Sequence, residues 1–218
     1  MGFFSGLFSK KPKLKREPDK VWIKSEFKFT GMMDYVKTLQ TSECSIVLTT
    51  FFKDTFDKVL AMLNEKSFSF HEIDTTTYYH AANKIHFVSA ELLNNTNLLS
   101  QIIKHNQNKR MIFVFAEHYP ILSKEKILED KITALLPETG ASIMYFSALD
   151  EPLFAMFGNQ NIVNLMQKMG MKDDEMLEHA LITKSIESAQ KKVEEKITTE
   201  NKTDKSTDWF KQNRLDVV

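Results

Sequence analysis

The chain has 218 residues with 29 Lys and Arg against 29 Asp and Glu, and 42% of its residues are hydrophobic, which is typical of an ordinary globular protein. Its single cysteine, Cys44, excludes a disulfide framework and a cluster of thiolate metal ligands. The apolar runs are far shorter than the roughly 18 to 20 residues that a membrane-spanning helix needs, so we expect no such helix.

Residues 1–24 carry seven bases against two acids, and we expect them to form a flexible arm. Four apolar side chains at helical spacing are followed at once by three lysines: Phe3, Phe4, Leu7 and Phe8, then Lys10, Lys11 and Lys13. This pattern is typical of a weak anchor at a membrane surface. A disordered start whose phenylalanines touch the body or a partner has the same pattern, and both interpretations stay open. The apolar part is too short for a signal peptide, so we expect a cytoplasmic protein.

Strand-like runs alternate with stretches of helical spacing from residue 25 to residue 150. The expected strands are residues 45–50, 68–73, 84–89, 111–116 and 142–147, and the expected helices lie near residues 31–41, 53–65, 90–105 and 123–136. This alternation predicts an α/β domain whose mostly parallel sheet is connected by crossover helices. Several runs are apolar at every position, which indicates that helices cover both faces of the sheet.

The pattern changes to helix alone from residue 151 to residue 200. Two short segments end at Gly158 and Gly170. A longer helix is expected to begin near residues 173–175 and to run to about residue 198, a length of about 40 Å at 1.5 Å per residue. Its apolar stripe requires a covering surface, on the chain's own sheet or on another chain. Residues 201–218 are expected to form a flexible tail in which Trp209 and Phe210 dock on a partner or pack back onto the body.

The sequence motifs of nucleotide and metal sites are absent. No Gly-Lys pair exists for a phosphate-binding loop, and the only glycine between residues 32 and 157 is Gly140, which excludes the dinucleotide fingerprint GxGxxG there. The six histidines never pair at ligand spacing with another His or Cys, so we expect no metal site. Because the body outside the arm is mildly acidic, a broad surface for nucleic acid is not expected either.

Residues 140–196 resemble the SecA family, the motor ATPases of bacterial protein export. The segment GASIMYFSALDEPLFAMFG (140–158) is similar to the family pattern G-x-S-x-F-x-L-S-L-E-D-x-L-M-x-x-F-G. Two groups of residues that resemble the family's next helical motifs follow in the same order. The first group is NLM and MGM (164–171), and the second is EH, TKSIE and AQKKVE (178–194). The likeness is weaker from residue 25 onward, where Glu117 and His118 stand at the place of an E-R-H turn.

The resemblance implies a degenerate second nucleotide-binding lobe of RecA-like fold, joined to the start of a long scaffold helix. The family's first lobe, with the Walker motifs that bind ATP, has no counterpart here. An arginine-finger motif is expected shortly before Gly140, yet no arginine occurs between Arg110 and Arg214. Because this finger stabilises charge on the transferred phosphate, we expect no autonomous ATPase activity and no cofactor, with ATP bound only beside a partner lobe.

Three functions follow as hypotheses from this comparison. The first is a non-catalytic binding module of protein export that docks on the export ATPase or the translocon, with weak membrane-surface contact through the arm. The second is one lobe of a split ATPase that acts only with a separate first-lobe protein. The third is a structural adaptor unrelated to export, since a fold alone does not determine function.

Overall fold

The computed structural model describes residues 14–41, 43–74, 85–137, 140–155, 159–168 and 170–215. The described residues form one sheet in the order β4-β5-β3-β6-β7-β2-β8. β1 lies outside this order and pairs with the start of β7, on the same edge as β2. All pairs are parallel except β2 with β8. The strands are β1 (Leu14–Arg16), β2 (Lys20–Trp22), β3 (Cys44–Thr50), β4 (Phe70–Glu72), β5 (Ile85–Ser89), β6 (Arg110–Phe115), β7 (Ala141–Ala148) and β8 (Leu177–Glu178).

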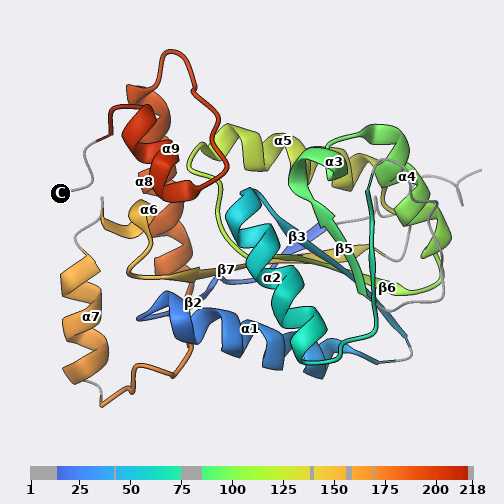
Figure 1. Ribbon diagram of the computed structural model, residues 1–218, viewed down its shortest axis with the longest axis horizontal. Helices are drawn as coiled ribbons and strands as arrows, with labels where there is room; N and C mark the ends of the chain where they lie inside the picture. The colour runs from blue at the N-terminus through green and yellow to red at the C-terminus, as the bar shows by residue number, and fades with distance from the viewer. Residues whose placement is uncertain are drawn as a thin grey trace, which may run out of the picture.

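Helices cover both faces of this sheet, and a further group packs at one end of it (Figure 1). On one face lie α1 (Ser25–Leu39) and α2 (Lys53–Glu65), and on the other lie α3 (Ala90–Leu93), α4 (Thr96–His105) and α5 (Leu122–Leu135). The end group contains α6 (Pro152–Ala155), α7 (Asn159–Lys168), α8 (Ala180–Lys196) and α9 (Ser206–Gln212). The prediction of an α/β fold with a mostly parallel sheet and flanking helices is confirmed.

Alternating side chains of the central strands supply two separate cores. On β3, Ile46 and Leu48 point toward α1 and α2, whereas Val47 points toward α3, α4 and α5, and all three are 0% exposed. This is the two-residue period of a strand with both faces covered. The predicted helix at residues 90–105 is interrupted, because the Asn95 side chain accepts hydrogen bonds from the Asn97 and Leu98 amides and so caps the start of α4.

Residues 14–16 and 20–22 are strands of the sheet, so the predicted boundary of the flexible arm at residue 24 was wrong. β1 pairs with the start of β7 and β2 with its end, and the intervening Asp19 is 0% exposed. Strands of three residues are too short to show alternation in the sequence, and the many bases nearby suggested a solvated segment. The membrane and partner candidates of the arm, Phe3, Phe4, Leu7, Phe8, Lys10, Lys11 and Lys13, lie outside the described residues.

The predicted long helix is shorter than expected and begins later. Leu177 and Glu178 pair with β2 as a strand, and the His179 side chain then caps α8 by accepting a hydrogen bond from the Leu181 amide. Helix α8 therefore has 17 residues and is about 25 Å long. Its stripe of Ile186, Ala189 and Val193 is fully buried in the chain's own core.

The predicted flexible tail instead contains α9, which packs in the same core as α6 and α8. Trp209 and Phe210 are 0% and 1% exposed, so the structure buries both side chains within the chain itself. Of the two interpretations, packing back onto the body is therefore the one that the structure shows. The prediction that these two side chains dock on a partner is corrected, because their apolar surface is already covered.

Replacing Gly31 with alanine should destabilise the protein by about 1 to 3 kcal/mol, because a Cβ at this position of α1 would lie 2.4 Å from Trp22 Cζ2. Trp22 is 3% exposed and stacks on Phe146, so its ring has little room to move. In an open helix interior the same substitution stabilises by about 0.5 to 1 kcal/mol. Urea denaturation provides the measurement. Thr30→Ala, at the exposed neighbouring position, is the control, and a Gly31→Ala variant as stable as this control would contradict the prediction.

Candidate functional site

The ends of β3, β6 and β7 bring several ionisable side chains to the carboxyl edge of the sheet. Glu117 and His118 follow β6, while Glu151 follows β7. Ligand and catalytic sites of open α/β sheets gather at this edge, because the loops that leave parallel strands converge there. The carboxyl edge is therefore the candidate site, and its chemistry depends on what each of these groups contacts.

Glu117 is held by the loop between β3 and α2. One carboxylate oxygen accepts hydrogen bonds from the amides of Phe51 and Phe52, both at 2.8 Å, and the other accepts one from Thr55 Oγ1 at 2.6 Å. Burial raises the pKa of Glu117 to about 7, while Lys28 acts against this shift. The carboxylate thus occupies the start of α2, where the amides of a helix attract anions.

A cavity of about 230 Å³ lies beside Glu117. Among the residues that line it, burial raises the pKa of Asp54 and lowers the pKa of Lys58, each only moderately. Lys28, which is 1% exposed, reaches across to Glu151 and to the Ala116 carbonyl, 2.9 Å away. Both carboxylate oxygens of Glu117 already accept hydrogen bonds, so this group acts as a structural acceptor at the start of α2.

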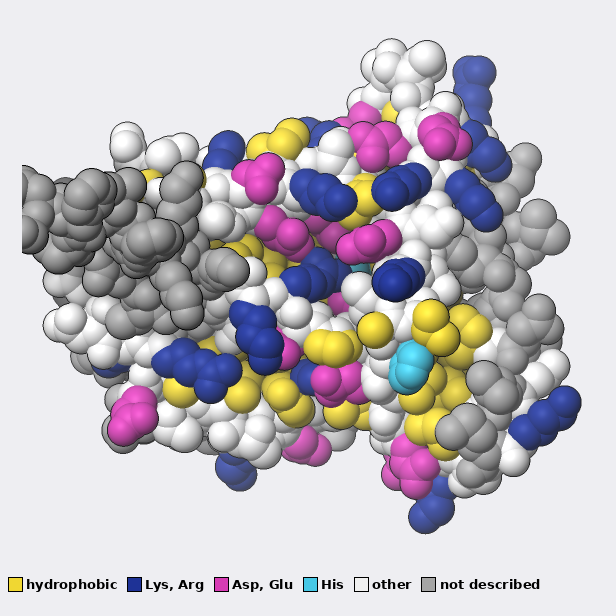
Figure 2. Space-filling view, turned by 180° about the vertical axis from the view of Figure 1, so that it is seen from behind, with side chains coloured by type: hydrophobic (Ala, Val, Ile, Leu, Met, Phe, Trp, Pro, Cys, Tyr) yellow, Lys and Arg dark blue, Asp and Glu magenta, His cyan; other side chains and the backbone are white. Residues whose placement is uncertain are grey.

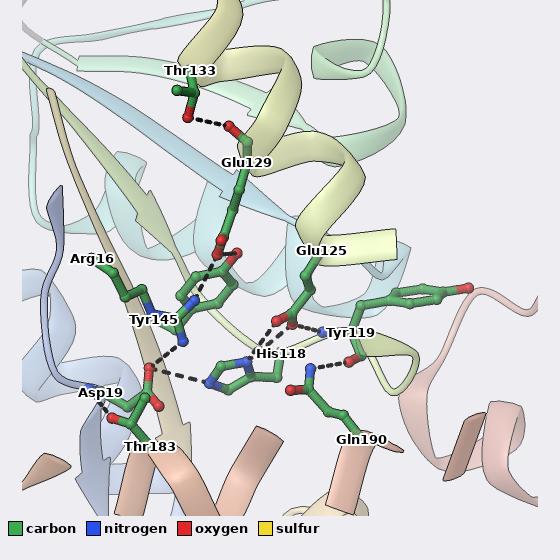
Figure 3. A network of polar contacts seen from close by, with 10 residues as sticks. All are labelled: Arg16, Asp19, His118, Tyr119, Glu125, Glu129, Thr133, Tyr145, Thr183 and Gln190. Atoms are coloured by element: carbon green, nitrogen blue, oxygen red, sulfur yellow. Dashed lines mark hydrogen bonds and ion pairs between the residues drawn. The ribbon is translucent and has the colours of Figure 1, made fainter. Parts of the chain in front are cut away.

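His118 lies between two buried carboxylates (Figure 3). Its Nδ1 lies 3.0 Å from Glu125 Oε1, its Nε2 lies 3.4 Å from Asp19 Oδ1, and its ring stacks on Tyr145 at 4.5 Å between centroids. Burial alone would lower the pKa of His118, but Glu125 and Asp19 outweigh it and raise this pKa to about 9. His118 is therefore a buried cation at neutral pH.

Arg16 provides the second cation of this network and is half-buried, with 26% of its side chain exposed. Its guanidinium donates hydrogen bonds to Asp19 Oδ1 at 2.9 Å and to Glu129 Oε1 at 2.7 Å, and lies 4.0 Å from the centroid of the Tyr145 ring. Burial lowers its pKa, but Asp19, Tyr145 and Glu129 together hold it above the ordinary value. The Asp19 amide in turn donates to Thr183 Oγ1 on α8 at 3.0 Å.

The network ties five parts of the chain together: the β1–β2 segment, the end of β6, α5, β7 and α8. Its carboxylates also accept hydrogen bonds from neutral donors, since the Tyr119 amide donates to Glu125 at 2.6 Å and the Tyr145 hydroxyl donates to Glu129 at 3.0 Å. Buried charges persist only when they are paired in this way. Because its groups contact one another, the cluster joins these five parts of the fold.

No catalytic or cofactor-binding residue was predicted from the sequence. Glu117 and His118 were noted only as standing at the place of a family turn, and the structure places them at the carboxyl edge of the sheet. Arg16 and Asp19 were assigned to the flexible arm and were missed, because their partners lie 113 and 164 residues away in sequence. Within the described residues, no group of three His, Cys, Asp or Glu side chains is arranged to hold a metal ion.

Comparison with known proteins finds one clear similarity. No protein-family model matches the chain. The protein translocase subunit SecA of Pelotomaculum thermopropionicum is 49% identical over 53 residues, which are 24% of this chain and 6% of that protein. About a quarter of this chain is similar to SecA. SecA of Acidithiobacillus ferrooxidans is 52% identical over 50 residues, and SecA of an Anaeromyxobacter species is 53% identical over 57.

The resemblance to SecA predicted from the sequence motifs is thereby confirmed. The match spans only 6% of the length of these SecA proteins. Among solved structures, the C-terminal part of the Fun30 ATPase domain aligns with 79% of this chain and 55% of that chain, at a TM-score of 0.43 and 13% identity.

Proposed function

We propose that this chain is a non-catalytic binding module of the protein export machinery, acting in the cytoplasm beside a SecA-type ATPase. The observation that carries the proposal is the identity of about 50% to SecA over roughly 50 residues. In those relatives the matched stretch is 6% of a much longer protein. Most contacts of the stretch in SecA are therefore made with other parts of the SecA chain.

An apolar surface on the SecA-like segment supports this proposal. Helix α7, the segment after it, β8 and the start of α8 carry partly exposed apolar side chains: Ile162, Val163, Met171, Leu177 and Leu181. Leu181 is 64% exposed, and Figure 2 shows apolar side chains gathered on this side of the molecule. Exposed apolar patches with polar surroundings are typical of protein contacts. We propose that this surface contacts the export ATPase.

The carboxyl edge of the sheet supports a non-catalytic role. Its buried acids and bases, including Glu117 and His118, contact one another and backbone amides. Arg16 is engaged with Asp19 and Glu129, while Arg110 is at the amino end of β6. Transfer of a phosphoryl group from ATP requires side chains that face the phosphates.

Among the described residues, none of the helices could span a bilayer.

The test combines binding and turnover. Purified full chain should bind the SecA of its own host, and Leu181→Glu should weaken that binding by about tenfold or more, since a charge is placed in an apolar contact. Ile127→Glu is the matched control, because Ile127 is 51% exposed on α5 and is not one of the SecA-like residues 140–196. The chain alone should hydrolyse no ATP above background.

Three results would contradict the proposal. ATP turnover by the chain alone would make it an enzyme, and turnover that appears only with a separate nucleotide-binding protein would favour the split ATPase. Binding to neither SecA nor the translocon would leave an adaptor unrelated to export.

A further inference from the structure

A groove of about 830 Å³ lies at the carboxyl ends of β3 and β5. After β3 the chain moves outward to β4, returns through β5, and then crosses to β6 on the other side of β3. The direction of the strand order therefore changes beside β3. Open α/β sheets bind ligands in the crevice at such a point, where the loops leave in opposite directions. The position and the size of the groove are those of a binding site.

The floor of the groove is apolar and aromatic. Phe51, Phe56 and Leu60 line it from the side of α2, and Leu92 and Ile127 line it from α3 and α5. Ile127 is 51% exposed, and it and Leu181 are the large hydrophobic side chains most exposed among the described residues. Removing such surface from water favours binding.

The loop between α8 and α9 forms one wall of the groove through Lys202, Thr203 and Asp204. Glu200 fastens this loop, because it accepts hydrogen bonds from the Tyr119 hydroxyl, from Lys124 and from Trp209 Nε1, the last at 3.0 Å. The groove is thus a built feature of the fold with a fixed wall.

Acidic side chains outnumber lysines along the groove. The acids are Asp57, Glu72, Asp74, Glu91 and Asp204, and the lysines are Lys53, Lys124 and Lys202. All three lysines are paired, Lys53 with Asp57, Lys202 with Glu91, and Lys124 with Glu200 outside the lining. The five acids against three lysines leave the lining with a net negative charge. A ligand that complements this groove carries apolar side chains for the floor and positive charges for the rim.

We infer that the groove binds residues 1–13 of a second copy of this chain. These residues hold four large apolar side chains, Phe3, Phe4, Leu7 and Phe8, next to three lysines, Lys10, Lys11 and Lys13, and they contain no acid. The segment therefore has both features that the groove requires, apolar side chains for the floor and positive charges for the rim. The inference does not depend on a link to protein export.

The reach of the arm identifies a second copy as its source. Leu14 pairs with Ala141 on β7, which pairs with Met111 on β6, which in turn pairs with Ser45 on β3. Ser45 lies five residues before Thr50, where β3 ends. The path to the groove thus covers about 17 Å along the strands and three strand spacings of about 4.8 Å across them, before any detour around the covering helices. The six residues from Leu14 to Phe8 span about 20 Å when fully extended. The residues before Phe8 are therefore long enough to reach the groove of their own chain. Lys10, the lysine farthest from Leu14, is only four residues away, or about 14 Å when extended. The three lysines thus cannot reach the acidic rim on their own chain, and only a second copy brings them there together with the apolar side chains.

The test is sedimentation velocity of the full chain over a range of concentrations. The wild-type chain should self-associate, and Ile127→Glu and the paired change Phe3→Ser with Phe4→Ser should each weaken association by about tenfold or more. Leu181→Glu is the matched control for an exposed apolar residue outside the groove, and it should change association less than about twofold. A wild-type chain that stays monomeric at every concentration, or an Ile127→Glu variant that associates like Leu181→Glu, would overturn the inference.

A charge exchange tests direct contact. Changing Lys10, Lys11 and Lys13 to glutamate should weaken association, and adding Glu72→Lys and Glu91→Lys on the groove should restore most of it. Failure of this restoration would overturn the assignment of the arm to the groove. Vesicles with anionic lipid provide a competing surface: an arm that binds them while groove variants leave self-association unchanged would identify a membrane as the arm's true partner and would also overturn the inference.

Discussion

Replacing Arg16 with methionine should lower the free energy of unfolding by about 3 to 5 kcal/mol, the cost of removing one partner from a buried ion pair. The guanidinium donates to Asp19 and Glu129, and Asp19 is 0% exposed. Methionine keeps much of the apolar stem but leaves Glu129 without an ion-pair partner in the network, while Asp19 and Glu125 share His118 as their only cation. Urea denaturation followed by circular dichroism measures the loss.

Arg110→Met is the control for losing an arginine, because Arg110 is exposed at the start of β6 and its change should cost no more than about 0.5 kcal/mol. The double variant Arg16→Met with Asp19→Asn should recover part of the loss, since it removes the stranded charge along with its partner. If Arg16→Met proved no more destabilising than Arg110→Met, the network would not hold the β1–β2 segment on the sheet.

The central part of the fold could be predicted because its signals are local. The apolar runs that became β3, β5, β6 and β7 are long enough to identify, and the stripe of α2 has a clear helical period. β1, β2 and β8 have only three, three and two residues, so no period exists to read. β1 and β2 pair with β7, and β8 pairs with β2, so each of these strands has a partner that lies far away in sequence.

The candidate site was harder to predict, because a charge has the same sequence signature whether it is solvated or buried. Arg16 and Asp19 stand in a run of charged residues that a flexible arm would also show. Only the fold brings Glu129 and His118 to them. Trp209 illustrates the same ambiguity for apolar groups, since an aromatic residue in a polar tail has the same pattern whether it packs on its own chain or on a partner.

The protein should lose stability as the pH rises from about 6.5 to 9, because folding raises the pKa of His118 from its ordinary value of 6.5 to about 9. A histidine with a raised folded pKa stabilises the fold fully below its unfolded pKa, and this contribution disappears as the pH passes the folded pKa. At about 1.4 kcal/mol per unit of pKa shift, the loss is about 3 kcal/mol across this window. Glu117, whose pKa is raised from 4.5 to about 7, contributes a similar loss at lower pH.

Because His118 and Glu117 titrate over different pH ranges, their contributions to stability can be measured separately. Urea denaturation at intervals from pH 5 to pH 9.5 gives the slope of stability against pH for each variant. His118→Gln should flatten the slope above pH 7, whereas Glu117→Gln should flatten it only below pH 7. Nuclear magnetic resonance of His118 in the wild-type protein measures its pKa directly, even where a variant folds poorly. A value near 6.5 would show that Glu125 and Asp19 do not outweigh burial, and the buried network would then carry one cation rather than two.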